Sequence, residues 1–213
     1  MKSLRITEIF HSLQGESTTV GLPTVFVRLT GCPLRCNYCD TAYAFNGGGM
    51  ISIDDILMQV GAFGCEHVCV TGGEPLAQPN CIELLKRLCD AGHAVSIETS
   101  GARDISMIDP RVMIVMDLKT PDSGECEKNM LTNLPYLKPT DQIKFVLCSE
   151  NDYQWARTMI AEHELNKKTQ VLFSPSWGQL NPTTLADWII NDRLPVRFQL
   201  QLHKILWNDA PGH

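Results

Sequence analysis

The sequence predicts an α/β protein built as a partial, open β/α barrel of about six parallel strands. Short runs of apolar and β-branched residues alternate along the chain with segments of helical periodicity, which is the pattern of βαβ units. Polar and glycine-rich residues follow these runs, as in β/α barrels, where loops at the carboxyl ends of the strands form the site. Because about six or seven strands cannot close an eight-stranded barrel, we expect an open form. A flavodoxin-like open sheet is the alternative.

The first half of the chain supplies the elements that lead into the cysteine-rich loop. A short apolar segment and a polar string over 4–16 are interpreted as ending in a functional loop, and a strand is expected over 23–30. Ser52 is the expected N-cap of a helix with an apolar stripe. A further strand over 67–71 leads into glycines, and a helix over about 78–90 follows.

The second half repeats this unit of strand and connection. Strands are expected over the ranges 93–99, 112–118, 142–147 and 171–173, with helices over roughly 152–164 and 183–191. The segment Arg197–Ile205 is expected as one more strand-like run. Consecutive parallel strands then place their carboxyl ends at one edge of the sheet.

Composition and charge restrict the class of protein. The 213 residues are enough for one domain with a sizeable core, and the formal charge of −6 without a basic patch argues against nucleic acid or a membrane as partner. The amino-terminal residues lack the apolar core of a signal peptide, and no apolar run approaches the roughly 18 residues that span a bilayer. Nine cysteines fit thiols or metal ligands in a reducing compartment. We therefore expect a cytoplasmic protein.

Three cysteines with the spacing C-x3-C-x2-C, namely Cys32, Cys36 and Cys39, follow the strand over 23–30. A structural zinc site takes four protein ligands, and so does a simple electron-transfer iron–sulfur cluster. Three thiolates would leave one iron of a 4Fe–4S cluster open to a small molecule, so the motif favours a reactive cluster. The structural alternative is a zinc site completed by another pair such as Cys65 and Cys69; it is disfavoured because these two bracket a strand.

The cysteine motif and the later Gly72-Gly73-Glu74-Pro75 together resemble the radical S-adenosylmethionine (SAM) superfamily. The resemblance implies that the cysteines hold a 4Fe–4S cluster whose open iron is chelated by SAM. It also implies that the glycine motif contacts the SAM amino group. Glycine lets the backbone approach a ligand closely, and the Glu74 carboxylate can pair with an ammonium group.

Six further segments narrow the resemblance to the 7-carboxy-7-deazaguanine synthase family: 13–16, 26–29, 31–33, 36–41, 97–101 and 199–204. The resemblance covers nearly the whole chain and is weakest between about 120 and 170. It implies a lyase of queuosine biosynthesis that converts 6-carboxy-5,6,7,8-tetrahydropterin to 7-carboxy-7-deazaguanine with loss of ammonia, through a 5′-deoxyadenosyl radical. It further implies a single radical SAM domain over 1–213, with an N-terminal substrate loop and a C-terminal tail.

The resemblance also assigns cofactors, partners and site residues. The cofactors are a 4Fe–4S cluster, SAM and Mg²⁺; the partners are the pterin, an electron donor such as flavodoxin or ferredoxin, and a second copy in a homodimer. The metal ligands are Cys32, Cys36 and Cys39 for the cluster and Thr41 for Mg²⁺, a hard cation that suits oxygen ligands. The SAM-binding residues are Tyr38, Cys39, Asp40, Gly73, Glu74, Asp117, Leu118, Lys119, Ser174, Pro175, Ser176 and Trp177. The substrate-binding residues are Leu13, Gln14, Gly15, Glu16, Arg28, Thr71, His203 and His213. No catalytic side chain is expected beyond the cofactor site.

Several of these residues also have a structural interpretation. Arg28 lies among apolar strand residues, so either an anionic ligand or a structural acid must pair with it. Thr41 could cap the turn after Asp40, and His203 could be an ordinary core histidine. Two other functions would share the cysteine motif. One is a glycyl-radical-enzyme activase, which should not need the segments 13–16 and 199–204; the other is a non-enzymatic iron–sulfur electron carrier or zinc-binding module.

Overall fold

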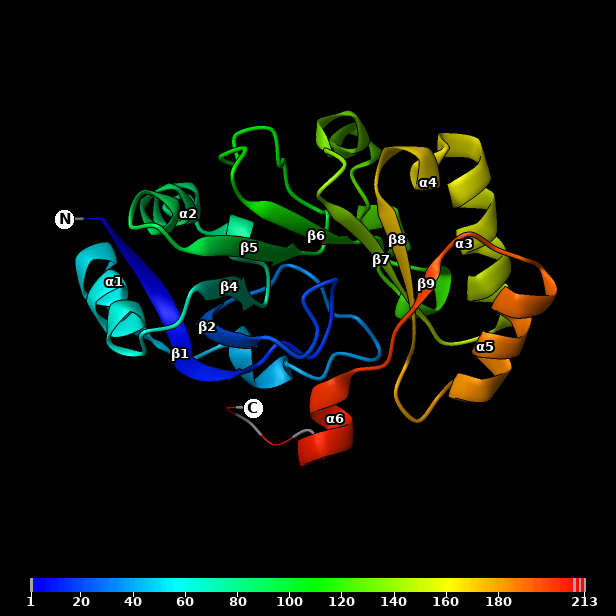
Figure 1. Cartoon of the computed structure of the whole chain (residues 1–213), viewed down its shortest axis with the longest axis horizontal. Helices are drawn as coiled ribbons and strands as arrows, with labels where there is room; N and C mark the ends of the chain where they lie inside the picture. Colours follow the sequence, from blue (N-terminus) through cyan, green and yellow to red (C-terminus); the bar gives the residue numbers. More distant parts are fainter. Residues whose placement is uncertain (1, 209, 211, 213) are drawn as a thin grey trace.

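A computed structural model of the chain describes residues 2–208, 210 and 212. Within this part of the chain one sheet contains nine strands in the order β3-β1-β2-β4-β5-β6-β7-β8-β9 (Figure 1). Their bounds are β1 (Ser3–Leu13), β2 (Pro23–Leu29), β3 (Gly49–Ser52), β4 (His67–Gly72), β5 (Ala94–Thr99), β6 (Met113–Asp117), β7 (Gln142–Leu147), β8 (Gln170–Pro175) and β9 (Arg197–Phe198).

The strands β2, β4, β5, β6, β7, β8 and β9 pair in parallel in this order, whereas β1 pairs antiparallel with both β2 and β3. The sheet does not close, because β3 and β9 occupy its two edges. The prediction of a partial, open β/α barrel is therefore confirmed. The two-residue β9 adds only a short edge to the six longer parallel strands.

The helices are α1 (Ile53–Ala62), α2 (Cys81–Asp90), α3 (Glu150–His163), α4 (Leu165–Lys168), α5 (Pro182–Asn191) and α6 (Leu202–Trp207). The expected N-cap of α1 is confirmed, since the Ser52 hydroxyl accepts a hydrogen bond from Asp55 N at 3.1 Å. Ser149 and Asn181 cap α3 and α5 in the same way. None of the helices in the described residues has both the length and the apolar character needed to cross a membrane.

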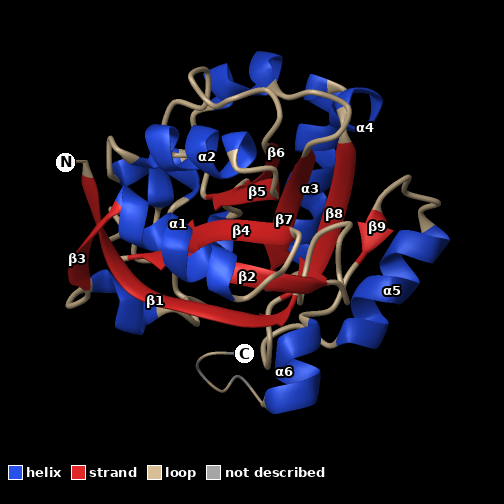
Figure 2. Cartoon of the chain, turned by 60° about the vertical axis from the view of Figure 1, so that its left-hand side comes forward, coloured by secondary structure: helices blue, strands red, loops and turns tan. Residues whose placement is uncertain are grey.

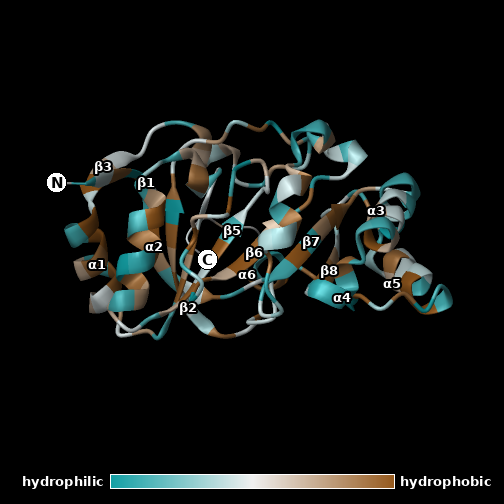
Figure 3. Ribbon diagram, turned by 90° about the horizontal axis from the view of Figure 1, so that it is seen from above, coloured by the Kyte–Doolittle hydropathy of each residue, from teal (hydrophilic) through white to brown (hydrophobic). Residues whose placement is uncertain are grey.

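The sheet has one face covered by helices and one that faces a cavity. Helices α1, α2 and α3 pack against β1, β5 and β7, and Figure 3 shows apolar strands with α1 and α2 at one end and α3 and α5 at the other. Side chains alternate between the two faces. In β7, Ile143, Phe145 and Leu147 are fully buried in the core under the helices, while Lys144 and Val146 line the cavity.

The structure differs from the expected elements at the two ends of the chain. The segment interpreted as a loop after a short apolar run is mostly strand, because β1 extends to Leu13 and pairs with β2 along its length. The prediction of a strand over 197–205 is wrong beyond Phe198, where α6 begins at Leu202. Figures 1 and 2 show α6 beneath the loops at the end of the sheet, where Leu202 N donates to Gly15 O at 3.0 Å.

Candidate active site

A cavity of about 430 Å³ opens at the carboxyl ends of the parallel strands. Each of the parallel strands β2, β4, β5, β6 and β7 contributes residues that lie near or just beyond its carboxyl end, as parallel topology requires. The loop after β1, the cysteine loop and α6 enclose the rest. The strand-end residues along the cavity include Arg28, Thr71, Gly73, Glu98, Ser100, Asp117 and Val146.

Cys32, Cys36 and Cys39 all line this cavity as half-buried free thiols. Backbone contacts hold the loop that carries them: Gly31 N donates to Ala44 O at 2.8 Å, and Asn37 N donates to Ser123 O at 3.0 Å. Burial raises the pKa of Cys36 to about 11, and the nearby Lys119 acts in the opposite direction. A cationic group beside the thiols favours the thiolate form that cluster iron requires.

The other proposed zinc ligands lie elsewhere in the fold. Cys69 is fully buried within β4, and the Cys65 thiol contacts Pro23 O at 3.2 Å, at the amino end of β2. The cysteine loop follows the carboxyl end of the same strand. The geometry therefore does not support a zinc site completed by this pair.

Polar atoms without partners mark one side of the cavity as suited to a ligand such as SAM. The Tyr38 hydroxyl and Asp117 Oδ1 are buried, line the cavity and have no hydrogen-bond partner among the described residues. Such groups are costly unless a ligand or water satisfies them. Lys119 lies 5.5 Å from the Tyr38 ring centre and 3.0 Å from Asp117 Oδ2. Three thiols, a free hydroxyl and a free carboxylate oxygen thus fit a cluster with a polar ligand bound beside it.

The two glycines after β4 bring the backbone against the cysteine loop. Gly72 has φ +146°, and a Cβ on it would lie 2.2 Å from Leu29 O. A Cβ on Gly73 would lie 2.3 Å from Gly31 O and 2.7 Å from the Cys32 Cβ. Only glycine allows this approach. The two sequence motifs therefore meet in space, through backbone packing as well as through any shared ligand.

Glu74 does not face the cavity, contrary to the expectation that its carboxylate pairs with an ammonium group. The side chain is fully buried and accepts hydrogen bonds from Thr99 Oγ1 at 2.9 Å and from Ser100 N at 2.7 Å. Leu76 N donates to the same carboxylate at 3.0 Å. Glu74 thus fastens the end of β5 to the turn after β4. This geometry gives it a structural role.

The remaining residues predicted for SAM divide into two groups. Those that line the cavity are Tyr38, Cys39, Asp40, Gly73, Asp117, Lys119, Ser176 and Trp177. The other three are not in the lining, because Leu118 is fully buried in the core and Ser174 and Pro175 belong to the buried strand β8. The Ser174 hydroxyl is buried without a partner among the described residues. The SAM roles of the first group stay predictions.

The residues predicted for substrate gather on the opposite side of the same cavity. Leu13 ends β1, and Gln14, Gly15 and Glu16 follow it. Arg28, Thr71 and His203 line the same cavity. A Cβ on Gly15 would lie 2.2 Å from His203 Nδ1, so α6 packs closely on this loop. His213 lies outside the described residues. The structure thus places segments more than 180 residues apart around one space, and their binding roles stay predictions.

Arg28 has a structural acid as a partner and also reaches the cavity. Its Nε donates to Glu8 Oε1 at 2.7 Å, and Tyr43 donates to the same oxygen at 2.8 Å. Burial opposes the charge, yet these neighbours hold the pKa of Arg28 above its ordinary value. Both sequence interpretations of Arg28 are thus compatible with its position. The guanidinium is cationic, preoriented by Glu8 and open to an anionic group.

Thr41 lies beside an aspartate that α6 holds in place. The Thr41 hydroxyl donates to Asp40 Oδ1 at 2.8 Å, which leaves its lone pairs free. Asp40 Oδ2 is paired with Lys204 at 2.8 Å. Although burial acts against the charged form, Lys204 holds the pKa of Asp40 well below its usual range. A hydroxyl beside a carboxylate offers the oxygen ligands that suit a hard cation.

The cavity residues that were missed as site residues in the sequence include Glu98, Lys144, Gln201 and Lys204. Glu98 accepts from Thr71 Oγ1 at 2.8 Å and from Gln14 Nε2 at 3.4 Å. The sequence contains a feature that could have indicated each of these four residues. Lys144 is a charged residue inside an apolar strand, as Arg28 is, and the others fall within the segments 97–101 and 199–204.

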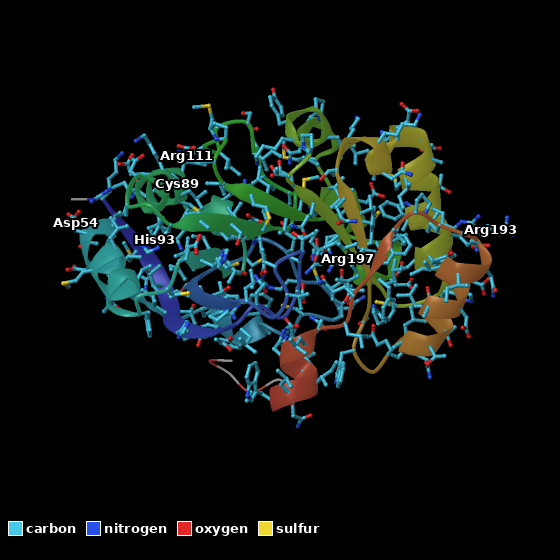
Figure 4. All side chains as sticks on the ribbon, in the orientation of Figure 1. Asp54, Cys89, His93, Arg111, Arg193 and Arg197 are labelled. Atoms are coloured by element: carbon cyan, nitrogen blue, oxygen red, sulfur yellow. The ribbon has the colours of Figure 1, made fainter. Side chains whose placement is uncertain are left out.

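The polar residues labelled in Figure 4 lie away from the cavity. Figure 4 labels Asp54, Cys89, His93 and Arg111 near α1 and α2, and Arg193 and Arg197 near α5 and β9. Arg111 pairs with Asp90 at 2.8 Å and Asp54 with Arg87 at 2.7 Å. The labelled residues do not belong to the cavity lining. Such exposed pairs contribute little to stability.

A loop of three free thiols at the carboxyl edge of an open β/α barrel, packed on a glycine motif, defines a radical SAM superfamily protein. The family profile described as "Radical SAM superfamily" matches residues 26–123, which include both motifs. The cofactors of this class are a 4Fe–4S cluster and SAM, and the residues along the cavity fit both.

Similarity to individual proteins extends over nearly the whole chain. The chain is 48% identical to 7-carboxy-7-deazaguanine synthase of Chlorobaculum tepidum, covering 98% of this chain and 97% of that protein. It is 41% identical to the synthase of Koribacter versatilis, over 96% and 97% of the two chains. The crystal structure of QueE from Escherichia coli superimposes with a TM-score of 0.80 at 24% identity, covering 94% of this chain and 95% of that one. The chain belongs to the 7-carboxy-7-deazaguanine synthase family.

Proposed function

We propose that the protein converts 6-carboxy-5,6,7,8-tetrahydropterin to 7-carboxy-7-deazaguanine with loss of ammonia. The observation that carries this proposal is that the three thiols and the polar loop after β1 share one cavity of about 430 Å³. The names of the relatives support the same reaction. When bound, the cluster and SAM supply one-electron chemistry that starts from reductive cleavage of SAM. The protein contributes placement and charge.

The charges around the substrate side suit a heterocycle that carries a carboxylate. Arg28 offers a preoriented cation for the carboxylate. Glu98 offers an acceptor for ring N–H or amino groups, and it is held by Thr71 and Gln14. Phe10 and Phe26 stack with ring centres 5.0 Å apart and line the cavity, so a planar ring has an apolar wall. Together these groups can bind and orient one face of a pterin.

Thr41 would hold Mg²⁺ between the cluster side and the substrate side. The residue follows Cys39 by two positions and lines the cavity with Asp40. Its hydroxyl oxygen keeps lone pairs for a cation because its hydrogen is directed to Asp40. An ion at this place would neutralise part of the negative charge of a bound carboxylate.

The electron donor and the oligomeric state belong to the same proposal. A small acidic electron-transfer protein such as flavodoxin or ferredoxin would deliver one electron to the cluster, and the protein would act as a homodimer. We place it in the cytoplasm, because thiolate ligands persist in a reducing compartment and all nine cysteines are free thiols.

The test is an anaerobic turnover assay with reconstituted protein, dithionite, SAM and the pterin, with and without Mg²⁺. We expect consumption of the pterin and formation of 7-carboxy-7-deazaguanine, detected by mass spectrometry. Formation of 5′-deoxyadenosine without consumption of the pterin would contradict the proposed substrate. That result would favour the alternative function, a glycyl-radical-enzyme activase.

A further inference from the structure

Lys144 occupies an unusual position for a charged residue. It lies in the middle of β7, whose six residues are all buried, and its side chain is 11% exposed. Its strand neighbours Ile143 and Phe145 point into the core, so Lys144 points to the cavity face. A buried ammonium group is unfavourable unless carboxylates pair with it. The partners of Lys144 therefore explain why the fold retains it.

Two carboxylates from opposite sides of the cavity meet at this ammonium group. Lys144 Nζ forms a salt bridge with Glu16 Oε2, from the loop after β1, and lies 3.6 Å from Asp117 Oδ2, at the end of β6. Lys144 and Asp117 are register partners in the parallel pair, so the backbone itself sets this approach. The first carboxylate belongs to the predicted substrate side and the second to the predicted SAM side.

Each of these carboxylates has one oxygen paired with a lysine. The second oxygen of each has a different environment. Glu16 Oε1 accepts from Gln201 Nε2 at 2.7 Å. Asp117 Oδ1 is buried and has no partner among the described residues, although Oδ2 is paired with Lys119 at 3.0 Å. Lys144 and Lys119 thus hold Asp117 Oδ2 from two sides, while Asp117 Oδ1 stays available as an acceptor for a ligand.

The pKa shifts of Lys144 and Glu16 agree with a charged ion pair between them. Burial alone would lower the pKa of Lys144, but Glu16 and Asp117 outweigh it and hold that pKa above its ordinary value. Burial alone would raise the pKa of Glu16, and Lys144 holds it below the usual value. Without the ammonium group, the buried Glu16 carboxylate would lose its ion pair, and Asp117 would keep only Lys119.

We propose that Lys144 is a positioning residue that orients Glu16 for the substrate and Asp117 for SAM at the same time. It acts through these two carboxylates and not by touching the reacting atoms. The inference rests on the proposed function, since it assigns the two sides of the cavity to the pterin and to SAM. It goes beyond that function by naming one buried cation on which both binding sites depend.

The experiment measures binding and not turnover. Dissociation constants for SAM and for the pterin are measured separately by calorimetry on reconstituted, unreduced holoenzyme. The Lys144→Met variant is expected to bind each ligand at least about tenfold more weakly than wild type. Lys144→Arg, which keeps the charge, is expected to bind both more tightly than Lys144→Met.

A matched control separates positioning from general stability. Lys138 forms a comparable pair with the fully buried Asp141, next to the amino ends of β6 and β7 and outside the cavity lining. The Lys138→Met variant is expected to lower the melting temperature but to keep both dissociation constants within about twofold. If Lys138→Met weakens binding as much as Lys144→Met, the effect is global and the proposal is overturned.

A second variant keeps the test decisive if Lys144→Met does not fold. In Lys144→Met/Glu16→Gln, the Glu16 carboxylate is replaced by a neutral amide, so that of the two carboxylates only Asp117 remains charged next to position 144. We expect this variant to bind SAM more weakly than Glu16→Gln alone, because Asp117 has lost Lys144 and is held by Lys119 alone. Equal SAM affinity in the two variants would overturn the role toward Asp117. A failure of the proposed function is distinguishable, because it would appear in the wild-type protein as absent pterin binding.

Discussion

Individual side chains at the strand ends differ in whether the fold has already used their polar atoms. The Glu74 carboxylate accepts hydrogen bonds from Thr99 and Ser100. Tyr38 and Asp117, in contrast, each retain a buried polar atom without a partner among the described residues. Cys36 is a free, half-buried thiol on a loop, so it too is available to a ligand. Because unused polar groups are the ones that a ligand can satisfy, this distinction guides the choice of variants.

Replacement of Cys36 by Ala should remove the cluster and leave the fold intact. The thiol lies on a loop outside the core, so we expect a change in unfolding free energy of about 0.5 kcal/mol or less in the apo protein. Iron and sulfide analysis with visible absorption measures the cluster, and urea unfolding measures the fold. Cys126→Ala, a half-buried thiol outside the cavity lining, is the control and should load normally. Unfolding of Cys36→Ala would show that the loop is structural.

Replacement of Thr41 by Ala should reduce the Mg²⁺ dependence of turnover and raise the KM for the pterin. The variant lacks the hydroxyl oxygen that lies beside Asp40, while the cluster thiols are untouched. Turnover is measured across a magnesium titration, with cluster content as a check. Thr41→Ser keeps the hydroxyl and should restore most of the response. An unchanged magnesium response in Thr41→Ala would remove this residue from the site.

Among the elements, the connections after β2 and β4 are the ones that depend on each other. The turn after β4 lies against the cysteine loop through Glu74 N, which donates to Gly31 O at 2.9 Å. On the other side, Gln199, which lies between β9 and α6, contacts the loop after β1: it accepts from Ser17 N at 2.8 Å and donates to Ser17 O at 2.7 Å. Each contact joins segments that are distant in sequence.

Replacement of Gly73 by Ala should reduce cluster loading as well as SAM binding. The new Cβ would lie 2.3 Å from Gly31 O and 2.7 Å from the Cys32 Cβ, so the cysteine loop must shift. We expect at least about a fivefold loss of SAM affinity and a lower iron content after reconstitution. Gly61→Ala serves as the control, since it lies in α1 with open space around its Cβ. Normal iron content in Gly73→Ala would show that the loop tolerates the shift.

For the molecule as a whole, a buried charge network connects the loop after β1 with the strand ends. Glu16, Lys144, Asp117 and Lys119 form a continuous series of ion pairs along the cavity. Their side chains are between 10% and 15% exposed, so water screens them only weakly. The stability of the whole domain should therefore depend on the protonation of this network.

The stabilisation that Glu16 provides should be lost in acid. Its pKa in the folded protein lies below the ordinary value of 4.5, so its charge stabilises the fold above pH 4.5 and progressively less as the pH falls. In the apo protein, Glu16→Gln should be less stable than wild type by roughly 3 kcal/mol at pH 7, as for other broken buried pairs. Urea unfolding at several pH values measures this difference. A difference that stays constant below pH 4.5 would contradict the assignment.

The sequence by itself determined the parallel strands, the cysteine loop and the family. Apolar runs define strands locally, and three cysteines at fixed spacing on a strand-end loop restrict the chemistry wherever the loop lies. Boundaries were close for the central elements, for example Gln142–Leu147. Local periodicity could not show that 202–207 is helical, because this segment is only six residues long and is held by its contact with Gly15.

Only the tertiary structure decided which polar side chains face the cavity. Glu74 and Lys144 illustrate the two directions: the glutamate of the glycine motif is turned into the fold, and a lysine inside an apolar strand reaches the site. Arg28 proved to have Glu8 as a structural partner. The physical reason is that side-chain direction and charge pairing depend on neighbours far away in the sequence, such as Glu16 and Lys144, which are 128 residues apart. Sequence spacing carries no information on such neighbours.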